Sequence, residues 1–243
     1  MFQTDPFALI VVLVGLSLIP FVAMIATSYL KIVVVMSLIR NALGIQSIPP
    51  NMVINALAMI LTFYIMAPVA SESWNIITEE RAKFAAARQA EQPAGGQAAG
   101  GQAAGGVQET AAVLYESDIA AKAAEPFRKF LSDHTSARER AFFVGTAETL
   151  WGKEDEPAKV DSESFYILLP SFCVSELTKA FQIGFLVYLP FIAIDIIVSN
   201  ILLAMGMMMV SPVTISLPFK LLLFVMVNGW TLLIQGLVRG YAV

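Results

Sequence analysis

Two long apolar stretches constrain the fold of this 243-residue chain more than any other feature. Between Phe7 and Ile39 the only charged residue is Lys31, and residues 165–210 hold just three charges. Charged residues make up 14% of the chain, against about 25% of an average soluble domain. Such sequence is typical of segments that lipid or other protein surrounds. The chain is therefore predicted to be an all-α integral membrane protein.

The lengths of these stretches predict bent helices. A helix over the 33 residues from Phe7 to Ile39 would reach about 50 Å, whereas the hydrocarbon core of a bilayer is about 30 Å thick. Pro20 is expected to kink it. Gly44 is expected to close this helix before Pro49 and Pro50. A second span is predicted over 52–69, ending at Pro68.

The C-terminal stretch is also too long for one straight span. At least two helical pieces are predicted over 165–210, with a kink at Pro190. A turn is expected at Ser211–Leu217, and a last helix from Pro218 to Val238. Long kinked helices or hairpins are thus expected in both apolar blocks.

Charge divides the chain into three parts: an N-terminal block over 1–70, a polar region over 71–164 and a C-terminal block over 165–243. The polar region carries 10 of the 15 basic and 16 of the 19 acidic residues, a net charge of −6. Within it, the repeat GGQAAGGQAAGG at 95–106 has no bulky apolar side chain and predicts a flexible linker.

Helices are expected on both sides of this linker. Residues 72–91 predict a solvated helix, and residues 111–150 predict amphipathic helix with a new start at Pro126. Arg40 is the only charge of the first connection, and basic loops tend to remain in the cytoplasm. The polar region is therefore expected on the periplasmic side.

The sequence lacks the sets of residues that common enzyme mechanisms require. His134 is the only histidine and Cys173 the only cysteine, so a Ser-His-Asp set, a disulfide or a Cys/His metal cluster is not expected. His134 is expected to face solvent, and Cys173 to pack as a small apolar residue. No nucleotide-binding motif occurs, and the acidic balance carries no nucleic-acid signature. We expect no enzyme activity and no cofactor.

The charges inside the apolar blocks are the candidate site residues, because an unpaired charge in lipid is costly. Glu176 and Lys179 lie three residues apart on one helical face. They form either a local pair or a pair with another element, such as Lys220. Asp195 is either a hydrogen-bonded structural carboxylate or a proton carrier.

Met207, Met208 and Met209 follow Gly206 and precede Pro212. Three consecutive side chains cannot all face one side of a helix. They therefore indicate a loop of deformable apolar side chains, although plain core packing is the alternative. Around a pore, such a loop would form a soft seal.

The motifs of both blocks resemble the FliP/SctR family of type III secretion export-apparatus membrane proteins. The resemblance lies in SEL-x-x-AFQIGF from Ser175, YLPF-x-x-ID from Tyr188, AMGMMM and ISLPFKLLLF. The first block adds LKIVVVMSLIRNALGIQ-x-PPN, and the polar region adds EPFRKFL followed by HTSARER. The order and spacing agree over most of the chain outside about residues 80–110. The absence of a visible signal peptide favours the injectisome branch over the flagellar one.

The resemblance implies a role and a set of partners. Family members form a homo-oligomeric ring, here expected to be a pentamer, with two small membrane proteins similar to SctS/FliQ and SctT/FliR. The ring lies in the bacterial inner membrane within the secretion basal body, beside the switch protein and the export gate of the same apparatus. It passes unfolded protein substrates.

The resemblance also implies residue roles. Met207, Met208 and Met209 correspond to a methionine gasket, and Glu176 with Lys220 corresponds to an intersubunit salt bridge. The chain is thus expected to be the core pore-forming subunit of a type III secretion export gate. One alternative is a secondary transporter or proton channel that uses Glu176, Lys179 and Asp195. Another is a structural anchor without a pore.

Overall fold

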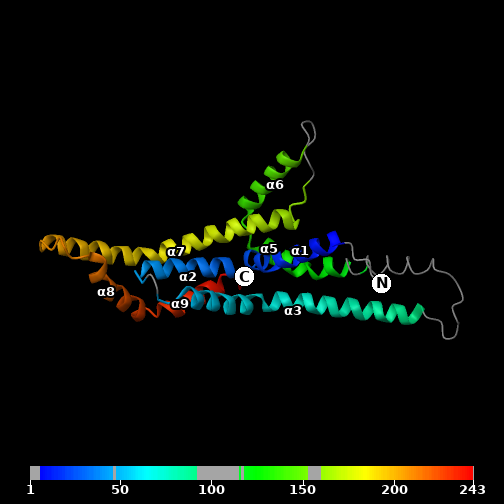
Figure 1. Ribbon diagram of the computed structural model, residues 1–243, viewed down its shortest axis with the longest axis horizontal. Helices are drawn as coiled ribbons and strands as arrows, with labels where there is room; N and C mark the ends of the chain where they lie inside the picture. The colour runs from blue at the N-terminus through cyan, green and yellow to red at the C-terminus, as the bar shows by residue number, and fades with distance from the viewer. Residues whose placement is uncertain (1–5, 46–47, 92–114, 116–117, 153–159, 243) are drawn as a thin grey trace. The chain divides into compact units, whose positions relative to one another are not determined.

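The computed structural model describes residues 6–45, 48–91, 115, 118–152 and 160–242. These described stretches hold α-helices and no strand, so the all-α prediction is confirmed. The labelled helices are α1 (Pro6–Ile25), α2 (Tyr29–Ala42), α3 (Asn51–Glu91), α5 (Glu125–His134), α6 (Ala137–Trp151), α7 (Phe165–Ala204), α8 (Pro212–Met226) and α9 (Gly229–Arg239) (Figure 1).

The chain divides into two compact units, and each is described by itself. The first joins Met1–Ile65 to His134–Val243, and the second is Met66–Asp133. The GGQAA repeat at 95–106 lies outside the described residues.

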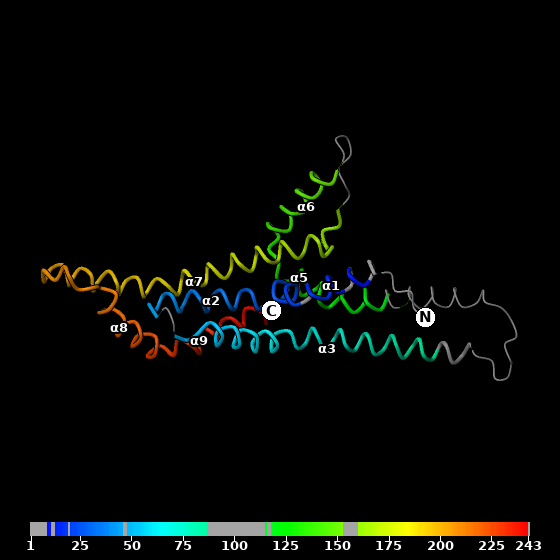
Figure 2. Tube along the Cα trace, viewed as in Figure 1, coloured from blue at the N-terminus to red at the C-terminus, as the bar shows by residue number. Residues whose placement is uncertain are grey.

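Helix α7 is the central element of the first unit, with α2, α6 and α8 packed against it. Its 40 residues correspond to about 60 Å, and Figure 2 traces it as one unbroken helix. The prediction of two or more helical pieces is therefore wrong up to Ala204. Pro170 and Pro190 both lie inside α7. Each removes one backbone donor, a loss that neighbouring helices and side chains can offset.

The first apolar block breaks, but not at the predicted residue. Pro20 lies inside α1, and the chain bends by 58° between α1 and α2. The bend falls at 26–28, where Thr27 and Ser28 stand. The Thr27 hydroxyl donates to the Ala23 carbonyl at 2.8 Å. Hydroxyl side chains of this kind compete for backbone hydrogen bonds and bend helices.

The second span is longer than predicted. Helix α3 continues through Pro68 to Glu91, so the predicted solvated helix over 72–91 is its continuation. Just after the proline, the Ser71 hydroxyl donates to the Pro68 carbonyl at 2.8 Å. The start of α3 is as predicted: Gly44 closes the chain after α2 with φ of 78°, and α3 begins directly after Pro50.

The C-terminal segment forms two helices instead of a turn and one helix. Pro212 begins α8, where its missing N–H is not needed, so 213–217 are helical rather than a turn. A 58° bend then separates α8 from α9. Asn228 is left-handed there, with φ of 52°. A Cβ on Gly229 would lie 2.2 Å from Cε2 of Phe224, so the backbone passes the Phe224 ring more closely than a side chain allows.

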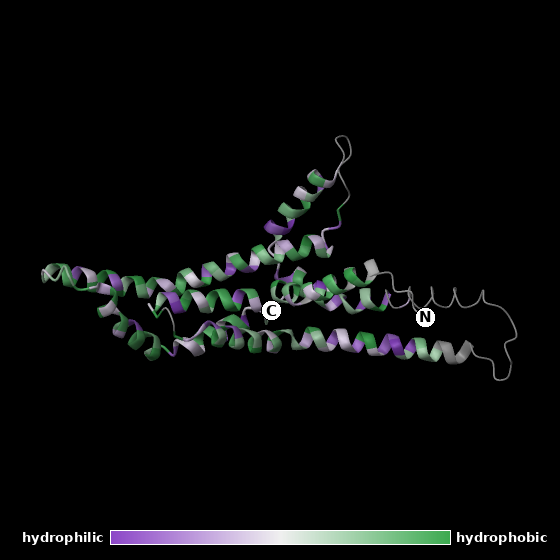
Figure 3. Ribbon diagram, in the orientation of Figure 1, coloured by the Kyte–Doolittle hydropathy of each residue, from purple (hydrophilic) through white to green (hydrophobic). Residues whose placement is uncertain are grey.

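Length and composition allow membrane crossing. Among the described residues, α3 and α7 are long and apolar enough to span a bilayer, and up to four spans result if each bent pair is one. Many large apolar side chains of α1 and α7 are exposed, and Figure 3 colours the hydrophobic residues of the chain green. The apolar core of the first unit lies between α2, α7, α8 and α9 and includes Ile32, Val35, Met36, Ile39, Ala180, Phe191, Phe224 and Leu237.

In the second unit, ion pairs and a ring stack join α3 to residues 115–122. Glu80 on α3 pairs with Lys83 at 2.9 Å and with Lys122 at 3.2 Å. Hydrogen bonds to Asp118 and Glu80 raise the pKa of Lys122. Tyr115 stacks on Phe84 and donates its hydroxyl to the Glu80 carbonyl. In α5, Pro126 is the second residue, so the predicted helix start is confirmed.

Candidate functional site

The methionine loop, residues 205–211, joins α7 to α8. Gly206 has φ of 72°, a left-handed conformation that favours glycine, and the Met207 N–H donates to the Leu202 carbonyl at 2.9 Å. The exposed fractions of Met207, Met208 and Met209 are 41%, 82% and 101%. The chain thus places the three methionines on a loop, as predicted, and directs them away from its own core.

A half-buried ion pair ties the arms of the α7–α8 hairpin together. The Lys220 ammonium lies 2.6 Å from Oδ2 of Asp195 and donates to the Ala42 carbonyl at 3.1 Å. The Ser216 hydroxyl donates to Oδ1 of Asp195 at 2.6 Å. Asp195 is therefore a hydrogen-bonded carboxylate that joins α7 to α8. Through its bond to the Ala42 carbonyl, Lys220 also joins α8 to the end of α2.

The second cluster surrounds Glu176, whose side chain has no exposed surface. Oε2 lies 3.1 Å from the ammonium of Lys31 on α2, and Oε1 lies 3.1 Å from that of Lys179. The Tyr241 hydroxyl donates to Oε2 as well. Burial and the Glu176 charge raise the pKa of Tyr241, so the hydroxyl keeps its proton. We call Glu176, Lys31, Lys179 and Tyr241 the Glu176 cluster.

Two further contacts close the cluster. The Lys179 ammonium donates to the His134 carbonyl at 2.6 Å, and the Lys31 ammonium lies 3.7 Å from the centre of the Tyr241 ring. The His134 ring is half-buried, 5.0 Å from that of Tyr241. The prediction that His134 faces solvent is therefore wrong, because the C-terminal turn covers it.

The Glu176 cluster and the Asp195–Lys220 pair test the sequence prediction about how Glu176 is paired. The local Glu176–Lys179 pair is present, whereas Glu176 and Lys220 bind different partners within one chain. Their predicted pair joins two subunits and stays a prediction. Sequence reasoning missed Lys31 and Tyr241 as partners of Glu176. The signal for Lys31 was present, because a lone charge in an apolar block needs a counter-charge.

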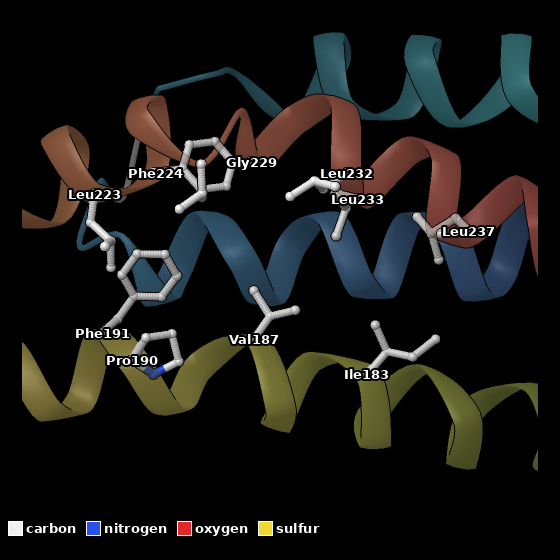
Figure 4. Close-up of a pocket in the computed structure, with 12 residues that line it drawn as sticks. Ile183, Val187, Pro190, Phe191, Leu223, Phe224, Gly229, Leu232, Leu233 and Leu237 are labelled. Carbon is white, nitrogen blue, oxygen red and sulfur yellow. The ribbon is translucent and has the colours of Figure 1, made fainter.

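A pocket of about 480 Å³, lined by apolar residues, lies between α7, α8 and α9. Figure 4 shows Ile183 and Val187 of α7 facing Leu233 and Leu237 of α9 across it. No charged side chain lines it, so it offers no ligand for a metal or a polar cofactor. Within the described residues no group of three His, Cys, Asp or Glu side chains is placed to hold a metal ion.

Long apolar helices, charges satisfied inside the chain and an exposed apolar loop define a helical membrane protein. The model of the FliP family matches residues 12–237, and the chain belongs to that family. This confirms the resemblance to the FliP/SctR type III secretion proteins drawn from the motifs.

Relatives from virulence systems match the chain over nearly its whole length. The Yop proteins translocation protein R of Yersinia pestis is 46% identical over 98% of this chain and 97% of its own. The hypersensitivity response secretion protein HrcR of Ralstonia nicotianae is 44% identical over 96% of each chain. The virulence protein YscR of Salmonella typhimurium is 41% identical over 98% of each. These relatives place the chain in the injectisome branch.

Proposed function

We propose that this chain is the core pore-forming subunit of a type III secretion export gate, through which unfolded proteins cross the bacterial inner membrane. The methionine loop carries the proposal. Met208 and Met209 expose 82% and 101% of their surface at the tip of a hairpin that an ion pair fixes. Flexible thioether side chains adapt to irregular apolar surfaces. A ring of such loops would close around a passing polypeptide and limit ion leak.

The exposed apolar helices support an assembly. Large side chains such as Leu16 and Phe21 on α1 and Phe185 on α7 are more than half exposed. Apolar surface of this extent is typical of contact with lipid or with other subunits. We propose a homo-oligomeric ring, a pentamer, completed by two small membrane proteins similar to SctS/FliQ and SctT/FliR. The switch protein and export gate of the same apparatus adjoin it, and the polar region 71–164 is periplasmic.

The proposed intersubunit pair of Glu176 with Lys220 has a physical requirement. Each side chain already holds an ion pair within its own chain, and each is almost fully buried. An intersubunit bridge therefore needs an exchange of partners on assembly.

Single-cysteine subunits test this exchange. A Glu176→Cys subunit and a Lys220→Cys subunit, both in a Cys173→Ala background, would be co-expressed and oxidised. A disulfide-linked heterodimer is expected. Its absence, in rings that do assemble, contradicts the pair. Lys179→Cys with Lys220→Cys is the matched control.

Native mass spectrometry tests the assembly. The tagged chain would be co-expressed with the genes of the two small membrane proteins and extracted in mild detergent. A ring of defined stoichiometry that carries both small subunits is expected. A stable monomer or dimer that never recruits them contradicts the proposal.

One observation favours a second candidate, a secondary transporter or proton channel. Asp195 keeps 34% of its side chain exposed inside an apolar helix, as a proton carrier requires. Glu176 and Lys179 would complete such a path. This candidate predicts proton flux in vesicles that contain this chain alone, and loss of that flux in Asp195→Asn. The pore proposal predicts no Asp195-dependent flux from the chain alone.

A further inference from the structure

The side chain of Glu176 cannot meet a second subunit in the conformation described above. It has no exposed surface, and both carboxylate oxygens accept from donors of the same chain. Any contact with another copy therefore requires one of three covering groups to move. These groups are Lys31, Lys179 and Tyr241.

The three groups differ in what their movement would cost. Lys31 lies in α2, which packs along α7 and carries buried side chains such as Ile32 and Val35. Lys179 shares α7 with Glu176, and its ammonium is also held by the His134 carbonyl at 2.6 Å. Tyr241 lies beyond α9, in the short turn 240–242. A short turn outside the packed helices opens locally at a lower free energy than a helix does.

The contacts of the turn converge on Tyr241. Its main-chain bonds run from the N–H groups of 240–242 to carbonyls of α9 or its end. The Tyr241 side chain adds the bond to Glu176 and the contact with the Lys31 ammonium. A Cβ on Gly240 would lie 3.9 Å from that ammonium. The turn is therefore docked onto α2 and α7 chiefly through one side chain.

We propose that Tyr241 is a latch: docked, it keeps the Glu176 carboxylate on its own chain, and released, it frees that carboxylate for a lysine of a second copy. The inference deepens the proposed function, on which its second-copy part rests. Release requires no covalent step, and no helix has to unfold. The unassembled subunit is thus a closed form, and assembly proceeds from the open one.

Hydrogen–deuterium exchange of the extracted, unassembled subunit tests the latch itself. The reporters are the main-chain N–H groups of residues 240–242, which donate to carbonyls of α9 in the docked turn, and their exchange rate is measured with and without Tyr241→Phe. Loss of the hydroxyl removes a hydrogen bond to a charged group, so the rate is expected to rise by about tenfold. Tyr64→Phe, at an exposed tyrosine of α3, is the matched control and is expected to leave the rate unchanged.

A second reporter separates a latch from general loosening. Native Cys173 lies on α7, half-buried. In Tyr241→Phe, the rate at which maleimide labels Cys173 is expected to stay unchanged. An unchanged exchange rate at residues 240–242, or an equal rise in the labelling of Cys173, would overturn the latch.

The assembled ring tests the second-copy part. With Tyr241 intact, the main-chain N–H groups of residues 240–242 are expected to exchange faster in purified rings than in the unassembled subunit. A slower or equal rate in the ring would overturn release on assembly. If no ring forms, the proposed function fails, while the two measurements on the subunit still decide whether Tyr241 docks the turn.

Discussion

The Glu176 cluster and the methionine loop are opposites within one unit. Glu176 and Lys31 are almost wholly enclosed by protein, whereas Met208 and Met209 are almost wholly uncovered. A soluble domain would reverse this arrangement. The difference teaches that the charged groups of the apolar helices are paired inside the subunit, beside its apolar core, while much apolar surface faces what lies outside it. Mutations in the Glu176 cluster should therefore reduce the stability of the subunit, whereas mutations in the methionine loop should change the leak of the assembled ring.

The largest loss of stability is expected from Glu176→Ala. It leaves the Lys31 ammonium buried beside α7 with its counter-charge removed, which costs about 3–5 kcal/mol of unfolding free energy. Chemical unfolding of the purified subunit in detergent measures it. Glu163→Ala, at an exposed carboxylate, is the control and should stay within about 0.5 kcal/mol. Equal effects of the two would show that the cluster does not hold the unit together.

A smaller loss is expected from Lys220→Met. The remaining Asp195 carboxylate keeps its bond from Ser216 and 34% of its surface exposed. The expected cost is about 1–3 kcal/mol in the same assay. Lys83→Met, at a mostly exposed lysine, provides the comparison. A loss as large as that of Glu176→Ala would mean that the two clusters are equally enclosed.

Gly184→Ala measures how much the close packing of α7 against α2 contributes to stability. A Cβ there would lie 2.3 Å from Cδ1 and 3.3 Å from Cβ of Leu38, where α7 meets α2. Overpacking of this kind costs about 1–3 kcal/mol. Gly145→Ala on α6 meets open space, so helix propensity should stabilise it by up to about 1 kcal/mol. Adding Leu38→Ala should restore part of the loss, and no restoration would contradict the steric cause.

The smallest change in stability is expected from Met208→Ala with Met209→Ala. Both side chains lie outside the packed core, so the unfolding free energy should change by less than about 0.5 kcal/mol. Thermal unfolding of the subunit in detergent checks this. A marked loss of stability would mean that the loop packs against its own chain.

The sequence predicted the methionine loop better than it predicted the helix bends and the contacts of Glu176. Three consecutive methionines between Gly206 and Pro212 predicted a loop, because a local turn needs only local residues. Pro68 misled, because α3 continues through it to Glu91, and the predicted division of 165–210 into helical pieces does not occur before Ala204. The chain bends instead at Thr27–Ser28 and at Asn228, which carry weaker signals. Tyr241 reaches Glu176 across 65 residues, a contact that no local pattern encodes.

Ion conductance of assembled rings in planar bilayers tests the central claim most directly. The variant replaces Met207, Met208 and Met209 with alanine, and Met52→Ala, at an 81% exposed methionine of α3, is the matched control. The account predicts a severalfold rise in resting conductance for the triple variant alone, with the ring mass unchanged. Unchanged conductance in fully assembled triple-variant rings would contradict the methionine seal.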